Sequence, residues 1–195
     1  MDSKKTLQVN NLKKYGLIWE EDEHRKDFKF KKIRVPLLTE IKEKNITTDD
    51  KADSANFLIE GENYFALSIL NKTHKNTFDL IYIDPPYNTE NKDFNYNDSY
   101  VDKENSYRHS KWLSFMNKRL CLAKNLLKES GAIFISINEE ELAHLKLLCD
   151  EIFGESNYLT TFTVKVRHED RILKGDKDFH EVVEYLLLYR KSRAF

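Results

Sequence analysis

Apolar and polar positions divide the chain into a polar leading stretch and a region of regular periodicity. Residues 1–56 are dense in charge with few apolar anchors, and we interpret them as an N-terminal arm with some helix and irregular structure. From residue 57 onward, short apolar runs alternate with segments whose apolar residues recur at helical spacing. The pattern predicts an arm over 1–56 and a folded region over 57–195.

Apolar runs of strand length recur through the folded region. The run TFDLIYID, residues 77–84, is continuous and bounded by polar residues, which is typical of a strand covered on both faces. A short strand is also predicted at Phe57–Ile59, ahead of a turn at Gly61. The remaining strands are predicted over 132–137, 158–166 and 182–191.

Between these runs lie segments with helical spacing. Apolar residues over 64–70 indicate part of an amphipathic helix, and those over 110–131 a longer one with Gly131 as its C-terminal stop. A further helix is predicted to begin after a cap at Asn138 and to end at Gly154. This alternation predicts an α/β domain with a mostly parallel sheet, whose last two strands could form an antiparallel edge.

Composition narrows the class of protein. Of the 195 residues 40% are hydrophobic and 33% charged, which is typical of a soluble globular protein. The net charge of −1 provides no global positive field, so a polyanion would have to be held by a local patch. No signal peptide or membrane-length apolar run is visible, so we expect a cytoplasmic protein that does not contact a membrane. Cys121 and Cys149 are expected to be buried thiols, and the six scattered histidines predict no metal site.

The first long strand ends in an unusual group of residues, Asp84-Pro85-Pro86-Tyr87. Ligands bind beyond the carboxyl ends of strands in open α/β sheets, so Asp84 lies where a reactive group is expected. The two prolines fix φ and remove two backbone donors, which is expected to leave rigid carbonyl acceptors without a competing donor. Such acceptors beside a tyrosine ring suit a planar group with an exocyclic amine. A plain turn after a strand is the alternative interpretation.

These residues and their flanks resemble a known family. Asp84 to Tyr87 match the catalytic motif of amino-methyltransferases that act on DNA bases, and the surrounding sequence looks like the modification subunits of Type III restriction-modification systems. The resemblance implies an incomplete, Rossmann-like S-adenosylmethionine-dependent methyltransferase fold over 57–195. It is carried, in the family's order, by residues 15–21, 58–67, 81–89, 109–120, 131–154 and 182–192.

The resemblance implies a function and roles for individual residues. The family transfers a methyl group from S-adenosyl-L-methionine to the exocyclic N6 of an adenine flipped out of double-stranded DNA. Asp84 and the Pro85 carbonyl would hold the amine, Pro86 would set the turn, and Tyr87 would stack on the base. The aspartate opening the motif implies adenine rather than cytosine; an RNA or protein amine is a more distant alternative. Glu62 and Asn63 align with a segment that contacts the adenosine end of the cofactor, and the first turn of a helix is their alternative role.

The sequence also departs from the family. The chain's five glycines, Gly16, Gly61, Gly131, Gly154 and Gly175, form no closely spaced glycine turn of the kind that cradles the cofactor. We therefore expect a catalytic part truncated before the glycine-rich motif and the target-recognition region. The alternative to a methyltransferase is a catalytically inactive fragment or interaction module. The resemblance further implies a second modification subunit and a restriction subunit as partners.

Polar residues outside the motif supply further candidates. The stretch over 88–110 is predicted to be a long loop, and loops of this length often act as lids. Its tyrosines could brace a flipped base, and nearby cations could contact phosphate, although the solvated face of a helix or loop is the alternative for the cations. The candidates are Tyr96, Tyr100, Tyr107, Lys111, Lys118, Arg119 and the charged loop 167–177.

Overall fold

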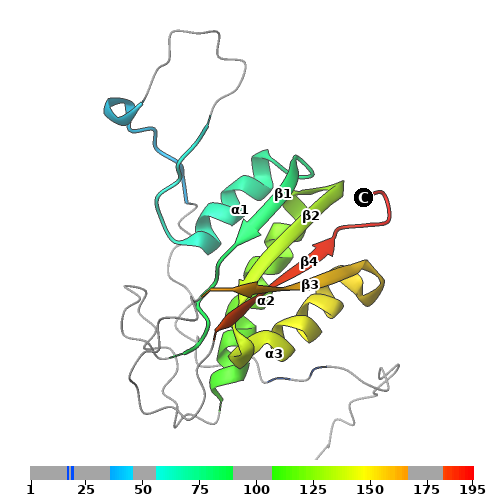
Figure 1. Ribbon diagram of the computed structural model, residues 1–195. Helices are drawn as coiled ribbons and strands as arrows, with labels where there is room; N and C mark the ends of the chain where they lie inside the picture. Colours follow the sequence, from blue (N-terminus) through cyan, green and yellow to red (C-terminus); the bar gives the residue numbers. More distant parts are fainter. Residues whose placement is uncertain (1–16, 18, 20–35, 46–55, 90–106, 167–181) are drawn as a thin grey trace, which may run out of the picture.

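The computed structural model describes residues 17, 19, 36–45, 56–89, 107–166 and 182–195. Strands and helices alternate along this part of the chain, so the predicted α/β class is confirmed (Figure 1). A short 3-10 turn, η2 (Lys42–Lys44), precedes the folded region. The remaining elements are α1 (Asn63–Thr73), β1 (Phe78–Ile83), α2 (Arg108–Leu126), β2 (Leu127–Ile137), α3 (Glu139–Cys149), η3 (Asp150–Gly154), η4 (Glu155–Asn157), β3 (Tyr158–Lys165) and β4 (Val183–Arg190).

The sheet is mixed and has the strand order β1-β2-β4-β3. β1 pairs with β2 in parallel, whereas β4 is antiparallel to both β2 and β3. Three strands therefore share one direction, and β4 alone runs against them from inside the sheet. The antiparallel contact expected between the last two strands is present, but the sheet has one parallel pairing rather than the mostly parallel pairing predicted.

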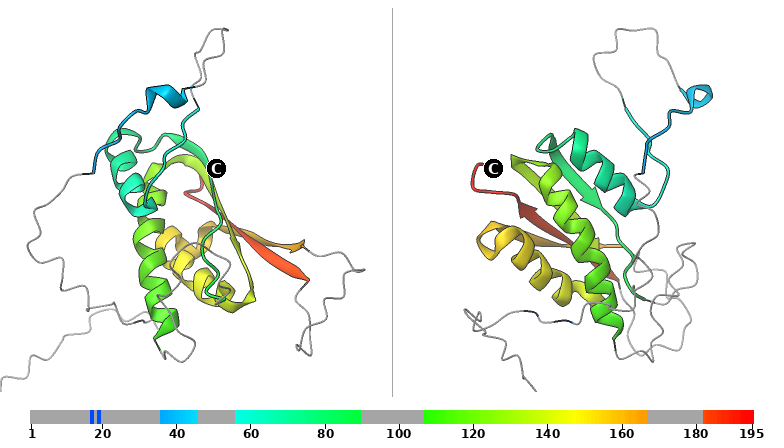
Figure 2. Two further views of the ribbon diagram at one scale, coloured as in Figure 1. Left: turned by 90° about the vertical axis from the view of Figure 1, so that its left-hand side faces the viewer. Right: turned by 180° about the vertical axis from the view of Figure 1, so that it is seen from behind.

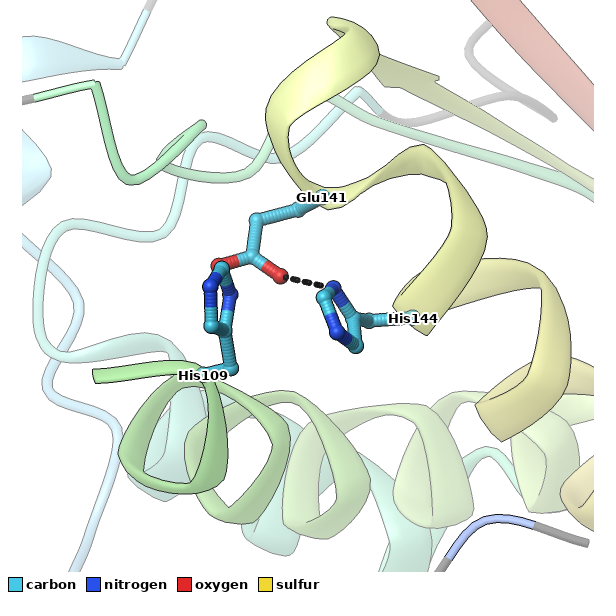
Figure 3. Close-up of side chains that lie close together, drawn as sticks. All are labelled: His109, Glu141 and His144. Atoms are coloured by element: carbon cyan, nitrogen blue, oxygen red, sulfur yellow. Dashed lines mark hydrogen bonds and ion pairs between the residues drawn. The ribbon is translucent and has the colours of Figure 1, made fainter. Parts of the chain in front are cut away.

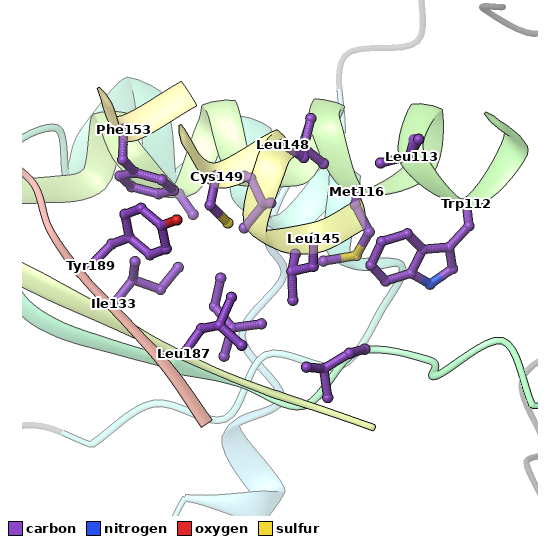
Figure 4. Close-up of a cluster of buried hydrophobic side chains, with 14 of the residues drawn as sticks. Trp112, Leu113, Met116, Ile133, Leu145, Leu148, Cys149, Phe153, Leu187 and Tyr189 are labelled. Atoms are coloured by element: carbon purple, nitrogen blue, oxygen red, sulfur yellow. The ribbon is translucent and has the colours of Figure 1, made fainter. Parts of the chain in front are cut away.

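The three α-helices lie on one face of the sheet (Figure 2). Alternate residues of β2 and β4 point into the layer between sheet and helices, as the two-residue period of a strand requires. Ile133 and Leu187 meet Leu145 of α3 there, in a fully buried cluster (Figure 4). Leu17 and Trp19, from the N-terminal arm, pack against the same cluster. The boundary predicted at residues 56 and 57 remains a prediction.

The opposite face of β1 is exposed in the described part of the chain. Leu80 is 57% exposed and Tyr82 58%, whereas their neighbour Ile81 packs against the core. The prediction that this strand is covered on both faces is therefore wrong for the described residues. A continuous apolar run fixes the strand but does not say which layers will cover it.

The short strand predicted at Phe57–Ile59 is also wrong. These residues lie outside regular structure, and Phe57 and Leu58 are 82% and 97% exposed. An apolar triplet becomes a strand only where a neighbouring strand pairs with it, and the described sheet ends at β1 on this side.

Gly131 does not end a helix, as the sequence predicts, but lies inside β2. α2 stops at Leu126 and β2 begins at Leu127 without an intervening loop. The register of β1 against β2 shifts between Phe78 and Leu80, and the β2 segment before Ala132 bulges there. A Cβ on Gly131 would stand 3.0 Å from the carbonyl oxygens of Lys128 and Phe78. Close backbone approach is therefore the reason for this glycine.

The helix starts follow their caps. Asn138 accepts a hydrogen bond from the Glu140 amide at 3.2 Å and caps α3, as predicted. The predicted end at Gly154 also holds, because α3 continues through the π-helical η3 and the chain turns at Gly154 with φ of 95°. Among the described helices, none combines the length and the apolarity that crossing a lipid bilayer requires.

Candidate active site at the carboxyl end of β1

Asp84 follows directly on Ile83, the last residue of β1, and its side chain is exposed. Pro85 is buried, and Pro86 and Tyr87 are partly buried as the chain turns away from the sheet. The four motif residues therefore lie together beyond the carboxyl end of a strand that has a parallel neighbour. This is the position that the sequence predicts for a ligand-binding edge.

The Pro86 carbonyl has a donor, contrary to the donor-free corner predicted from sequence. Trp112, from the first turns of α2, donates its indole Nε1–H to the Pro86 oxygen at 2.7 Å. Trp112 is itself buried in the core, so the bond fixes the turn to a rigid helix. Of the two proline carbonyls, Pro85 is the one that remains for the role proposed by resemblance.

Tyr87 is oriented by a residue that the sequence did not single out. Its hydroxyl donates to Glu184 Oε2 on β4 at 3.2 Å, and its ring packs against the core cluster. Burial, together with the nearby carboxylates of Asp84 and Glu184, holds the pKa of Tyr87 well above its usual range. Tyr87 is therefore a neutral phenol with a fixed ring, beside two carboxylate acceptors.

A second cluster lies next to the motif, on α2 and α3 (Figure 3). Glu141 is 0% exposed, and its Oε1 accepts from Asn88 Nδ2 at 2.5 Å and lies 2.8 Å from His109 Nδ1. His144 Nδ1 lies 3.0 Å from the other oxygen, outside hydrogen-bond geometry, and its ring stacks on His109. The sequence analysis treated the histidines as scattered, and the fold brings two of them together. The spacing of Glu141 and His144, three residues apart on a predicted helix, was the available signal.

These three side chains have the composition of a metal site, since their ligand atoms lie within 4.8 Å of one another. The surrounding bonds favour a different assignment. Arg108 donates Nε–H to His109 Nε2 at 3.2 Å, so that nitrogen must offer its lone pair. The proton of a neutral His109 then resides on Nδ1 and points at Glu141, leaving no lone pair there for a cation. The cluster is best described as a hydrogen-bonded network.

The predicted cofactor residues lie at the N-terminus of α1. α1 runs back along β1, so this terminus lies toward the same edge of the domain as the end of β1 (Figure 1). Glu62 caps α1 by accepting from the Tyr64 and Phe65 amides, and it forms an ion pair with Arg119 of α2. Asn63 is the exposed first residue of the helix. The Glu62 carboxylate is therefore already engaged, and a cofactor contact by either residue remains a prediction.

The remaining candidates separate into three groups. Arg119 lies over the Phe115 ring and binds Glu62, so its guanidinium is engaged on α2 rather than directed to a phosphate. Lys118 is exposed, Lys111 is partly exposed, and Tyr107 is the cap residue of α2. Tyr96, Tyr100 and the loop 167–177 lie outside the described residues.

Comparison with known proteins places these features in context. A family model described as DNA methylase matches residues 78–195. The Mod subunit of the probable Type III restriction-modification enzyme HindVI of Haemophilus influenzae is 41% identical over 140 residues, which are 68% of this chain and 18% of that protein. The StyLTI Mod subunit of Salmonella typhimurium is 38% identical over 168 residues, 75% of this chain and 25% of that protein.

Two further comparisons involve other classes of methylase. The Type II methyltransferase M.KpnI of Klebsiella pneumoniae is 41% identical over 151 residues, 76% of this chain and 35% of that protein. A solved DNA modification methylase from Thermus thermophilus, complexed with S-adenosyl-L-methionine, is 15% identical with a TM-score of 0.46, over 67% of this chain and 54% of that one. The chain spans about a fifth to a third of the length of the curated relatives it matches.

Proposed function

Because this chain belongs to the DNA methylase family, whose model covers more than half of it, we propose that it supplies the base-holding part of a site-specific DNA methyltransferase. The family membership confirms the resemblance seen in the sequence. The proposed reaction transfers a methyl group from S-adenosyl-L-methionine to the exocyclic N6 of a flipped adenine. The observation that carries the proposal is the exposed Asp84 carboxylate on a rigid turn at the carboxyl end of β1.

The motif residues act on the amine in this proposal. Asp84 and the Pro85 carbonyl accept the two N6 hydrogens, which holds the amine so that its nitrogen faces the incoming methyl group. The nitrogen forms the new bond to carbon, and Asp84 stabilises the positive charge that develops on the nitrogen before a proton leaves. Tyr87 offers its ring face to the purine, and Glu184 keeps that ring in place through the hydroxyl.

The described residues fit S-adenosyl-L-methionine in charge. When bound, the cofactor supplies an electrophilic methyl group on a cationic sulfur. Asp84 and Glu184 place two carboxylates around Tyr87, and such an acceptor-rich edge favours a cation. Glu62 and Asn63, proposed by resemblance for the adenosine end, would have to use groups other than the carboxylate oxygens that cap α1 and bind Arg119.

Label transfer tests the function. The protein, purified as it occurs with any chains that copurify, is incubated with methyl-labelled S-adenosyl-L-methionine and a varied pool of duplex DNA, and labelled N6-methyladenine is measured. Asp84→Ala is expected to lower transfer by about 100-fold or more, because a residue that touches the reacting amine is lost. Asp79→Asn is the matched control, since Asp79 is an exposed carboxylate on the same strand that pairs with Lys128. Absence of label in adenine from the unmodified protein would refute the proposal.

A second candidate function is an interaction module without activity of its own. The observation that favours it is the lack of closely spaced glycines in the sequence, since such a turn is what the family uses to cradle its cofactor. Calorimetry of the 195-residue chain with S-adenosyl-L-methionine separates the two candidates. Micromolar binding would contradict the module, whereas no binding would favour it.

Partners and location follow from the proposed function. Double-stranded DNA is the proposed substrate, and a second modification subunit and a restriction subunit are the proposed protein partners. The support is the similarity to proteins named as Mod subunits of Type III restriction-modification enzymes. A DNA-modifying enzyme acts where the DNA is, so we place this protein in the cytoplasm of a bacterial cell.

A further inference from the structure

We propose that Glu141 and Asn88 form a positioning pair that holds the Asp84–Tyr87 motif in its working geometry, a role that rests on the function proposed above. Neither residue belongs to the motif. Asn88 is the next residue after Tyr87, and Glu141 lies in the first turn of α3. Their contact joins the chain leaving the motif to a helix of the core.

Glu141 is a carboxylate whose burial needs an explanation. A buried carboxylate is costly unless several donors satisfy it. Glu141 is 0% exposed, and the donors around it come from two places, Asn88 after the motif and His109 at the start of α2. A purely structural cap would not require a buried charge at this position, because Asn138 already caps α3.

Asn88 has a backbone conformation that few side chains adopt. Its φ of 62° lies in the left-handed region, which asparagine tolerates better than most residues. Backbone strain of this kind persists only where the surroundings impose it. The 2.5 Å hydrogen bond from its side chain to Glu141 supplies that restraint, so the direction in which the chain leaves Tyr87 is fixed.

The residues on either side of Tyr87 are thus anchored separately. Pro86 is held by Trp112 of α2 at 2.7 Å, and Asn88 is held by Glu141 of α3 at 2.5 Å. Tyr87 between them is held through its hydroxyl by Glu184 of β4. Three elements therefore determine where the ring points, and misplacement of reacting groups by about 1 Å can cost about 100-fold in rate.

Substitution of Asn88 tests the pair without adding backbone strain. Asn88→Gly keeps the positive φ but removes the donor to Glu141. Methyl transfer is expected to fall by about tenfold, mainly in kcat, because the motif loosens while the binding groups remain. The matched control is Asn76→Gly, since Asn76 also has positive φ (55°) and lies in the turn between α1 and β1, away from the motif. Asn76→Gly is expected to leave transfer within about twofold of the unmodified protein.

A reciprocal exchange separates positioning from folding. Asn88→Asp sets two carboxylates against each other and is expected to lower transfer by about tenfold or more. Adding Glu141→Gln restores an amide-to-carboxylate hydrogen bond with its polarity reversed, and transfer is expected to return to within about threefold. Failure of the double variant to exceed Asn88→Asp, with both folded by thermal unfolding, would overturn the proposal.

A readout independent of catalysis uses Trp112, which contacts Pro86. In a Trp19→Phe background, Trp112 is the remaining tryptophan, and its quenching by acrylamide reports on the packing of the motif. Asn88→Gly is expected to raise the quenching constant about twofold, with the Asn76→Gly control unchanged. This result holds even if no DNA methylation is found, whereas unchanged quenching would contradict the pair. A rise in Tm on adding zinc that Glu141→Gln abolishes would also overturn it, because the cluster would then be a metal site.

Discussion

Single residues at the parallel pairing of β1 and β2 carry constraints that composition alone does not reveal. Gly131 lies where the backbone of β2 approaches the carbonyls of Lys128, Phe78 and Asp79. These atoms belong to the main chain, so they cannot move aside as a flexible side chain would. Its neighbour Ser130 is exposed and has no such restriction.

Gly131→Ala is expected to destabilise the protein by about 1–3 kcal/mol, because the added Cβ overpacks the β1–β2 junction. The free energy of unfolding, measured with denaturant, checks this. Ser130→Ala is the control and is expected to change it by less than about 0.5 kcal/mol. Equal effects of the two substitutions would contradict the assignment of Gly131 to a close approach.

Trp112→Phe tests the indole hydrogen bond to Pro86. The change keeps an aromatic ring in the core but removes the Nε1 donor, at a cost of about 1 kcal/mol in stability. Methyl transfer is expected to fall by more than stability alone explains, by about tenfold, since the turn that carries Asp84 and Tyr87 loses an anchor. Transfer measured at a temperature where both proteins are fully folded separates the effects, and unchanged transfer would show that the indole only packs.

At the scale of elements, the sequence predicts most of what the structure contains. β1, α1, α2, β3 and β4 lie where period and apolar runs place them, because each buries a face against the core. The strand at Phe57–Ile59 and the helix stop at Gly131 fail for one reason, since pairing between distant strands decides both and leaves no local signal. The same limit explains the site: Asp84 to Tyr87 are visible as a local motif, whereas Trp112, Glu141 and Glu184 meet them only in the fold.

The cap of α3 is an element whose strength can be measured. Asn138→Ala removes the acceptor for the Glu140 amide and is expected to lower the free energy of unfolding by about 1 kcal/mol. Asn138→Asp keeps an acceptor at a position that favours negative charge and is expected to cost less than the alanine change. A denaturant titration of both variants checks this order, and the reverse order would show that the side chain serves packing rather than capping.

At the scale of the whole molecule, the core contains a network that responds to alkaline pH. Tyr189 donates its hydroxyl to Asp150 Oδ1 at 2.7 Å, and burial together with that carboxylate raises its pKa. A raised pKa in the folded state favours the neutral phenol, so this stabilisation is complete below the unfolded pKa of about 10 and is lost as pH rises above it. Stability should therefore fall more steeply above pH ~10 in the unmodified protein than in Tyr189→Phe, as chemical unfolding at a series of pH values would show.

The two thiols report the integrity of the same core. Cys149 is buried, and desolvation with the nearby Asp150 carboxylate raises its pKa, whereas Cys121 is exposed. A disulfide reagent at neutral pH is expected to modify one thiol per chain in the native state and both after unfolding. Cys121→Ser should abolish the native reaction, and rapid modification of both thiols without denaturant would contradict the packing of α3 against the sheet.

The position of β4 has a consequence for how the site comes into being as the chain is made. β4 is the last of the four strands along the sequence, yet it lies between β2 and β3, so β3 pairs with no other described strand until β4 has been synthesised. Glu184 arrives on that strand, 97 positions after the tyrosine it orients. A nascent chain on the ribosome thus carries the motif long before it carries the acceptor that orients its ring.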